Sequence, residues 1–167
     1  MTKRTGGNLS KYESYREAWQ RIEASRQAGF FLEAIVIEES IIADRLVSYL
    51  SRPHSPNRVS KNKKGIWPVL GDLITALQSD FPAGLSIGNI EDVANALNDW
   101  RLDRNTAVHA IVKSDPGIPT VEVQEFLMLA EKAAERGAIL ARAISSWHQS
   151  AKRQSLDSEP TTESTEA

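Results

Sequence analysis

The residues of this chain best suited to chemistry are an arginine, an asparagine and a histidine in the segment Arg104-Asn105-Thr106-Ala107-Val108-His109. A histidine with an ordinary pKa near 6.5 can accept or donate a proton close to neutral pH. The planar guanidinium of arginine matches the oxygens of a phosphate group, and an asparagine amide can orient either partner by hydrogen bonding. The segment therefore predicts acid–base chemistry beside a phosphate, with Arg104, Asn105 and His109 as catalytic candidates.

A single helix does not bring all three side chains together. Asn105 and His109 are four residues apart and share a face, whereas Arg104 and His109 lie about 140° apart around the helix axis. Leu102, Asn105, His109 and Val112 form a stripe beside the core stripe of the same helix, and we expect it to face a second copy of the chain. Two copies would place two arginines and two histidines around one phosphate, so the sequence predicts a homodimer.

The chain has a second arginine–histidine pair, Arg142 and His148. Five residues lie between these two, whereas four lie between Arg104 and His109. If an asparagine must follow the arginine directly, the probability that such a segment occurs by chance falls to roughly one per cent. Only Arg104 meets that requirement. We therefore expect Arg142 and His148 to be a coincidence of composition. His54 lies in a proline-flanked loop, where we expect it to be exposed to solvent and not catalytic.

Several classes of site are excluded by composition and motif. The chain has no cysteine, which rules out disulfides, thiolate metal sites and a cysteine nucleophile. Three histidines without an HExxH or Glu-x-x-His pair leave no plausible zinc cluster, and glycine-rich nucleotide loops and the GxSxG elbow are absent. We expect no metal and no cofactor. Without a signal-peptide core or a run of roughly 18 apolar residues, we expect a cytoplasmic protein with no membrane span.

The elements that must position these residues are helices, because the apolar periodicity is helical almost throughout. We expect an all-α fold, a compact bundle of about five helices in residues 10–150, after a flexible N-terminal segment of residues 1–9. Residues 30–50 are apolar on most sides and predict the central helix. The expected helices cover residues 10–29, 30–50, 68–81, 89–114, and 120 to the end of the domain.

Helix ends are indicated by capping residues. Ser10 with Glu13 three residues later predicts a capping box at the start of the first helix, and Gly29 suits the left-handed turn at its end. Asn89 with Asp92 predicts the start of the fourth helix. The last helix carries a narrow apolar stripe, which we call the seam. Four tryptophans on four expected helices should anchor the core. The seam is Phe126, Ala130, Ala133, Gly137, Leu140, Ile144 and Trp147, and the tryptophans are Trp19, Trp67, Trp100 and Trp147.

Charge is distributed unevenly along the chain. The net charge is -2, but residues 154–167 carry four acids and no base, which leaves the rest of the chain at +2. This Ser/Thr/Glu-rich tail has too few apolar residues to offset the entropy of ordering it. We expect residues 151–167 to be a disordered acidic tail.

An all-α bundle with Arg-Asn-x-x-x-His in a late helix resembles the HEPN superfamily (higher eukaryotes and prokaryotes nucleotide-binding), and the resemblance covers residues 10–147. It implies a metal-independent endoribonuclease of toxin or antiphage-defence type, with its active site assembled across a homodimer interface and an antitoxin or nucleotidyltransferase as a further partner. His109 would act as acid or base, Arg104 would stabilise the phosphate, and Asn105 would orient His109 or a phosphate oxygen. Other members have lost catalysis, so a silent helical module that binds RNA or a partner protein is the alternative.

Family members often carry a polar residue in the second helix near the motif. Here Glu39 interrupts an apolar stripe, and a carboxylate among apolar neighbours needs a cationic or hydrogen-bonding partner. We expect Arg104 to be that partner. A structural pair with Arg45, an exposed edge position, and Glu38 in the same role are the alternatives.

A basic segment between the second and third expected helices is the candidate for holding the RNA backbone. Phosphate contacts position nucleic acid without themselves identifying its sequence. The alternative is a solvated, flexible connection. The segment, residues 52–64, has no acid and five positive charges, on Arg52, Arg58, Lys61, Lys63 and Lys64.

Overall fold

The computed structural model describes residues 5–110, 116–119 and 122–157, and this part of the chain forms five α-helices. β pairing within those ranges is limited to one bridge between Ile87 and Ile90. No helix in the described ranges is both long enough and apolar enough to span a membrane. The predicted all-α fold of five helices is confirmed. The helices are α1 (Thr5–Gln27), α2 (Phe31–Leu50), α3 (Leu70–Asp80), α4 (Val93–Ala110) and α5 (Val123–Asp157).

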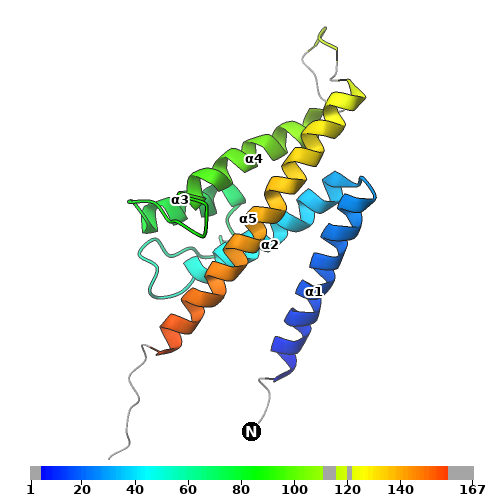
Figure 1. Cartoon of the computed structure of the whole chain (residues 1–167). Coiled ribbons are helices and arrows are strands. Elements are labelled where there is room, and N and C mark those ends of the chain that lie inside the picture. Colours follow the sequence, from blue (N-terminus) through cyan, green and yellow to red (C-terminus); the bar gives the residue numbers. More distant parts are fainter. Residues whose placement is uncertain (1–4, 111–115, 120–121, 158–167) are drawn as a thin grey trace, which may run out of the picture.

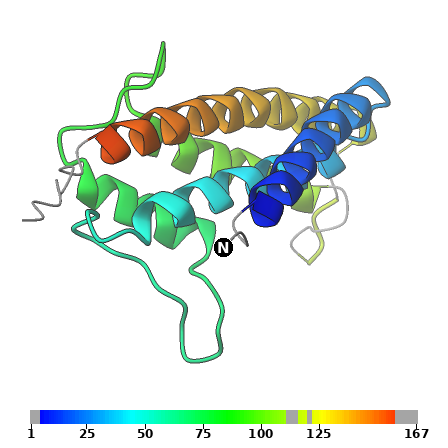
Figure 2. The same ribbon diagram turned by 90° about the horizontal axis from the view of Figure 1, so that it is seen from below.

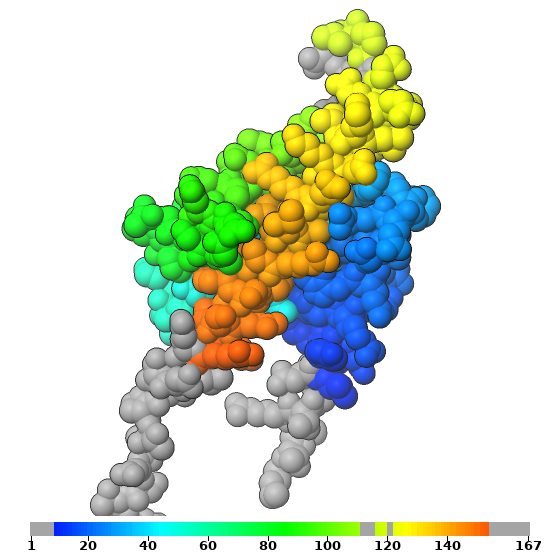
Figure 3. All heavy atoms as spheres, viewed as in Figure 1, coloured from blue at the N-terminus to red at the C-terminus, as the bar shows by residue number. Residues whose placement is uncertain are grey.

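The centre of the bundle is formed by α2 and α5, and α2 packs against each of the other four helices. α1 lies along one side of this pair, whereas α3 and α4 lie along the other (Figures 1 and 2). Ile35, Ile42 and Leu46 on α2 are fully buried, which confirms residues 30–50 as the central helix. The outer face of α5 is visible between α1 and the α3–α4 pair in the space-filling view (Figure 3).

The predicted seam on α5 packs against α2 and α4. The indole Nε1 of Trp100 donates a hydrogen bond to the carbonyl oxygen of Ala133 at 2.8 Å. A Cβ atom on Gly137 would overlap Glu38 Oε2 and would lie 2.9 Å from the Trp100 ring. The helices can therefore approach this closely only because position 137 has no side chain. Buried members of the seam include Phe126, Ala130, Ala133, Leu140 and Ile144.

The end of α1 confirms the expected glycine turn. Gly29 has φ of 77°, in the left-handed region that favours glycine. The backbone N–H of Phe30 donates to Ser25 O at 2.7 Å, and the N–H of Gly29 donates to Arg26 O at 3.2 Å. These two bonds are the Schellman pattern, which satisfies carbonyls at the end of a helix.

The start of α4 differs from the prediction that paired Asn89 with Asp92. Asp92 alone caps the helix, because its Oδ1 accepts the backbone N–H of Ala94 at 3.1 Å and of Asn95 at 3.2 Å. Asn89 lies instead in the tight turn between the bridged residues 87 and 90, and it is therefore outside the helix.

Other helix boundaries also differ from those expected. α1 begins at Thr5, so Ser10 lies inside the helix, where its carbonyl accepts a hydrogen bond from the Ser14 hydroxyl at 2.9 Å. A capping box at Ser10 is therefore wrong. α3 begins at Leu70 and not at residue 68. α5 continues to Asp157, so the prediction of a disordered tail is wrong for residues 151–157, which are helical. Residues 120 and 158–167 lie outside the described residues, as do residues 1–4 of the N-terminal segment.

The four tryptophans do not all anchor the core. Trp100 is fully buried, and Trp19 and Trp147 pack against the core from its edge. Trp67 lies in the connection between α2 and α3 and is 38% exposed. The prediction is wrong for Trp67 because its ring lies beside the Lys61 ammonium, 5.5 Å from the ring centroid, and not on a helix that faces the core.

Candidate functional site

A polar groove of about 570 Å³ lies between α2, α3 and α4, and it contains two of the three predicted catalytic residues. Arg104 and Asn105 enter it from α4, and Glu39 enters it from α2. Gly71 and Thr75 form part of its α3 wall. The groove is therefore made by packing of three helices that are well separated in the sequence.

The guanidinium of Arg104 is held by two acceptors. Its Nη2 forms an ion pair and a hydrogen bond with Glu39 Oε1, and its Nη1 donates to Asn105 Oδ1 at 2.7 Å. The predicted Arg104–Glu39 pair is therefore present. Asn105 orients Arg104 and not His109, and the buried Nε of Arg104 has no hydrogen-bond partner among the described residues. A phosphate that binds here must compete with the Glu39 carboxylate for the same cation.

Two further polar side chains of α4 share this groove and were missed from the sequence. Arg101 donates to Asn98 Oδ1 from Nη2 at 3.1 Å. Its guanidinium lies close to Gly71, where a Cβ atom would be 3.8 Å away. The spacing 98, 101 and 104 repeats every three residues, which places these side chains on neighbouring turns of one helix face. That periodicity was the signal that would have found Arg101.

His109 is exposed on the last turn of α4 and does not line the groove. Within one chain the structure therefore does not bring Arg104 and His109 into a single site, as their angular separation predicts. Leu102, on the predicted interface stripe, is 52% exposed. Val112, the fourth member of that stripe, lies outside the described residues.

Glu38 is not an alternative partner for Arg104. Its side chain is fully buried on the α5 side of α2, next to Gly137 and Trp100. Neither carboxylate oxygen has a hydrogen-bond partner among the described residues. Burial raises the pKa of Glu38 to about 8, and the positive charges of Arg26 and Arg142 only partly oppose that rise. At neutral pH this carboxyl group is therefore mostly protonated.

The second arginine–histidine pair is not a site either, because its members lie apart. Arg142 is exposed, with its guanidinium carbon 5.6 Å from the centroid of the Trp19 ring. His148 is buried, with Nε2 at 3.0 Å from Ser48 Oγ and 3.4 Å from Arg52 Nη2. Burial and nearby arginines lower the pKa of His148 to about 4, which keeps it neutral at physiological pH. His54 is exposed, as expected.

The α2–α3 connection that carries the basic segment has a defined shape. Near its start, Asp80 accepts hydrogen bonds from Ser55 Oγ at 2.6 Å and from the backbone N–H of Asn57 at 2.9 Å. At its tip, Asn62 Oδ1 accepts the backbone N–H groups of Lys64 at 2.9 Å and Ile66 at 3.1 Å. The connection projects from the bundle as a long loop in the second view (Figure 2).

The five cations of this segment differ in their surroundings. Arg52 lies beside His148, and Arg58 Nε donates to Ser51 O at 2.8 Å, so both support the start of the loop. Lys61 lies over the Trp67 ring, and Lys63 and Lys64 are exposed at the tip. The tip therefore presents positive charge beside an exposed aromatic ring. That combination can contact both phosphates and bases.

No protein-family model, no curated protein and no solved structure matches this chain. The described residues contain no group of three or more His, Asp or Glu side chains placed to hold a metal ion.

Proposed function

We propose that this chain is an endoribonuclease of the HEPN type that cuts RNA without a metal ion and works as a homodimer. The observation that carries the proposal is the arginine at the groove. Arg104 is held in one orientation by Glu39 and Asn105, and His109 is exposed on the next turn of the same helix. Metal-independent RNA cleavage needs a positioned cation and an accessible acid–base group, and the proposed dimer would bring the two together.

The proposed reaction is attack of the 2′-OH on the adjacent phosphate. One histidine accepts the proton of the 2′-OH, and a second histidine donates a proton to the departing 5′-oxygen, so that a 2′,3′-cyclic phosphate and a 5′-hydroxyl result. Arg104 stabilises the negative charge of the phosphorane. Two copies of His109 are required for the two proton transfers, which is why the site needs two chains.

Glu39 has a defined role in the proposed mechanism, because it is the partner of Arg104 that the phosphate replaces. In the free protein, Glu39 neutralises Arg104 and holds its side chain in the groove. When a phosphate replaces Glu39 as the partner, the cation is already close to its working position and loses little side-chain entropy. Arg101, in the same groove, would contact the neighbouring phosphate of the strand.

A cleavage assay with EDTA present tests this proposal. We expect the wild-type protein to cut single-stranded RNA and to leave 2′,3′-cyclic phosphate ends. His109→Ala and Arg104→Ala should each lose activity by roughly a hundredfold or more, because proton transfer and charge stabilisation each contribute about that much.

His54→Ala is the matched control, because His54 is an exposed histidine outside the groove. His148→Ala would be a poor control, since removing a buried ring destabilises the fold. Activity that survives His109→Ala, or that disappears with EDTA, would show that the proposed mechanism is wrong.

The second candidate function is a catalytically silent module that binds RNA or a partner protein. Two observations favour it: Arg104 is paired with a carboxylate, and His109 does not share its groove. RNA binding without cleavage by the wild-type dimer would support this alternative over the enzyme.

A further inference from the structure

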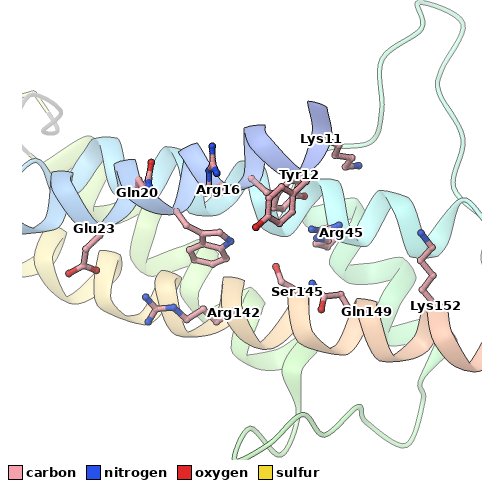
Figure 4. A pocket seen from close by; sticks show the side chains of 12 residues that line it. Lys11, Tyr12, Arg16, Gln20, Glu23, Arg45, Arg142, Ser145, Gln149 and Lys152 are labelled. Carbon is pink, nitrogen blue, oxygen red and sulfur yellow. The ribbon is translucent and has the colours of Figure 1, made fainter. Parts of the chain in front are cut away.

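A second groove lies on the other side of the central helix pair. It has a volume of about 730 Å³ and is lined by residues of α1, α2 and α5. Figure 4 shows side chains that line this groove on the facing helices, with Tyr12 and Arg45 towards one end and Arg142 and Glu23 towards the other. Since α3 and α4 lie beyond α2 and α5, this groove is separate from the one that holds Arg104.

The lining of this groove is strongly cationic. One carboxylate, Glu23, lies at one end. Lys11 is compensated by an ion pair with Asp44 at 3.0 Å, but Arg16, Arg45 and Arg142 form no ion pair with any described residue. The five cationic side chains of the lining are Lys11, Arg16, Arg45, Arg142 and Lys152.

Two of these arginines are fixed by aromatic rings. The guanidinium carbon of Arg45 lies 3.9 Å from the centroid of the Tyr15 ring, and that of Arg142 lies 5.6 Å from the centroid of the Trp19 ring. Cation–π contact uses the face of a guanidinium, whereas its N–H donors lie at the edge. The rings therefore hold the arginines in place and leave donors for an anionic ligand.

Unsatisfied donors at the bottom of the groove indicate a ligand that accepts hydrogen bonds. The Nε of Arg45 and the Oγ of Ser145 are buried and have no partner among the described residues. A buried donor without an acceptor destabilises the fold, so such groups are rare unless something binds them. Both residues line the groove, and phosphate oxygens would satisfy these donors once the side chains turn towards it.

The separation of the cationic side chains along the groove indicates the kind of ligand. Arg45 of α2 lies towards one end of the groove and Arg142 of α5 towards the other (Figure 4). One phosphate cannot reach both, but successive phosphates of a strand can. Tyr12, with a side chain 64% exposed, and Gln149 lie among the cations and offer a stacking surface and an amide to bases.

We propose that the α1–α5 groove binds a single strand of RNA through its phosphates, with a base stacked on Tyr12. The inference rests on the proposed RNA substrate, but it does not depend on cleavage. Because the groove lies across the central helices from Arg104, it would hold a part of the RNA that is not being cut.

Binding of a labelled oligonucleotide to the full-length protein tests the proposal. The probe is a fluorescein-labelled single-stranded RNA of about ten nucleotides, within the site sizes known for such grooves, and anisotropy is measured in the His109→Ala background so that cleavage cannot consume it. Removing two phosphate contacts with Arg16→Gln and Arg142→Gln should weaken binding several-fold and flatten the slope of log affinity against log salt by about 1.4.

The matched control removes the same charge elsewhere. Arg21→Gln with Lys132→Gln changes two exposed cations outside the groove and should leave affinity and slope nearly unchanged. If the double groove variant does not fold, Tyr12→Ala replaces an exposed ring. It should still weaken binding by about fivefold or more through lost stacking.

Three outcomes would overturn the proposal. The first is unchanged affinity in both the arginine variant and Tyr12→Ala. The second is displacement of the probe by uridine monophosphate as effectively as by unlabelled RNA, which would indicate a mononucleotide. The third is equally effective displacement by poly-glutamate, which would indicate an acidic polypeptide. Wild-type protein that binds the probe through this groove but never cuts it would contradict the proposed enzyme and not this site.

Discussion

Two adjacent glutamates of α2 have different surroundings. One residue along a helix is a rotation of about 100°, so Glu39 faces α4 and Glu38 faces α5. Glu39 pairs with the Arg104 guanidinium. Glu38 meets no hydrogen-bond donor among the described residues, and burial raises its pKa to about 8. The partner of Glu39 was predictable from the sequence, but which glutamate faced which helix depended on packing.

The raised pKa of Glu38 predicts that the stability of the folded protein falls as the pH rises. Between its ordinary value of 4.5 and its folded value of about 8, the unfolded chain ionises this group while the folded chain keeps it protonated. Its contribution to stability is therefore full below pH 4.5 and is lost as the pH rises towards 8. Glu38→Gln cannot ionise, so we expect it to be close to wild type at pH 5 and more stable by roughly 3 to 5 kcal/mol at pH 9. Urea unfolding at both pH values measures the difference.

The control for Glu38→Gln is the same substitution at an exposed glutamate of the same helix. Glu33→Gln is such a control, because Glu33 is exposed on α2. His148, with a pKa lowered to about 4, stabilises the fold fully above pH 6.5 and loses that effect as the pH falls, but equally in all three proteins. A difference between Glu38→Gln and wild type that stays constant from pH 5 to 9 would contradict the assignment.

At the scale of elements, the close approach of α2, α4 and α5 depends on one glycine. A Cβ atom at Gly137 would overlap Glu38 Oε2 and lie 2.9 Å from Trp100. We expect Gly137→Ala to destabilise the protein by about 1 to 3 kcal/mol, because overpacking outweighs the helix propensity of roughly 1 kcal/mol that alanine contributes. The midpoint of urea unfolding measures this change.

Gly71→Ala is the control for helix propensity. A Cβ atom there would meet the Arg101 guanidinium at 3.8 Å, an ordinary contact distance. Since Gly71 is also helical, this change should leave stability unchanged or raise it by up to about 1 kcal/mol. Equal effects of the two substitutions would mean that the helices are not packed tightly at Gly137.

Helices were predictable as elements because their determinants are local. The turn at Gly29 needs only a residue that tolerates positive φ, and the α5 seam follows from spacing along one segment. The start of α4 was less certain, since Asn89 and Asp92 are both capping residues. The bridge between Ile87 and Ile90 places Asn89 in a turn, and only Asp92 remains free to cap.

At the scale of the whole molecule, the two grooves could not be predicted, because each is made by segments far apart in the sequence. The Arg104 groove joins Glu39 of α2 to residues 69–75 and to α4. The α1–α5 groove joins residues 11–23 to Arg45 and to residues 142–152. Periodicity shows which face of a helix is apolar, but it does not show which helix will lie against that face.

A site that needs two histidines also requires a second copy of the molecule, and we expect it to pack on α4 around the exposed residues Leu102 and His109. Leu102→Asp should therefore convert a dimer into a monomer of about 18.5 kDa in light scattering, and cleavage should be lost with the dimer. Ile139→Asp is the control, since Ile139 is a comparably exposed apolar residue on α5. Mixing inactive Arg104→Ala and His109→Ala proteins should not restore the wild-type rate, because a mixed dimer keeps one Arg104 and one His109 while the proposed site needs two histidines. A wild-type protein that remains monomeric at micromolar concentration would leave His109 without its partner and would contradict the shared site.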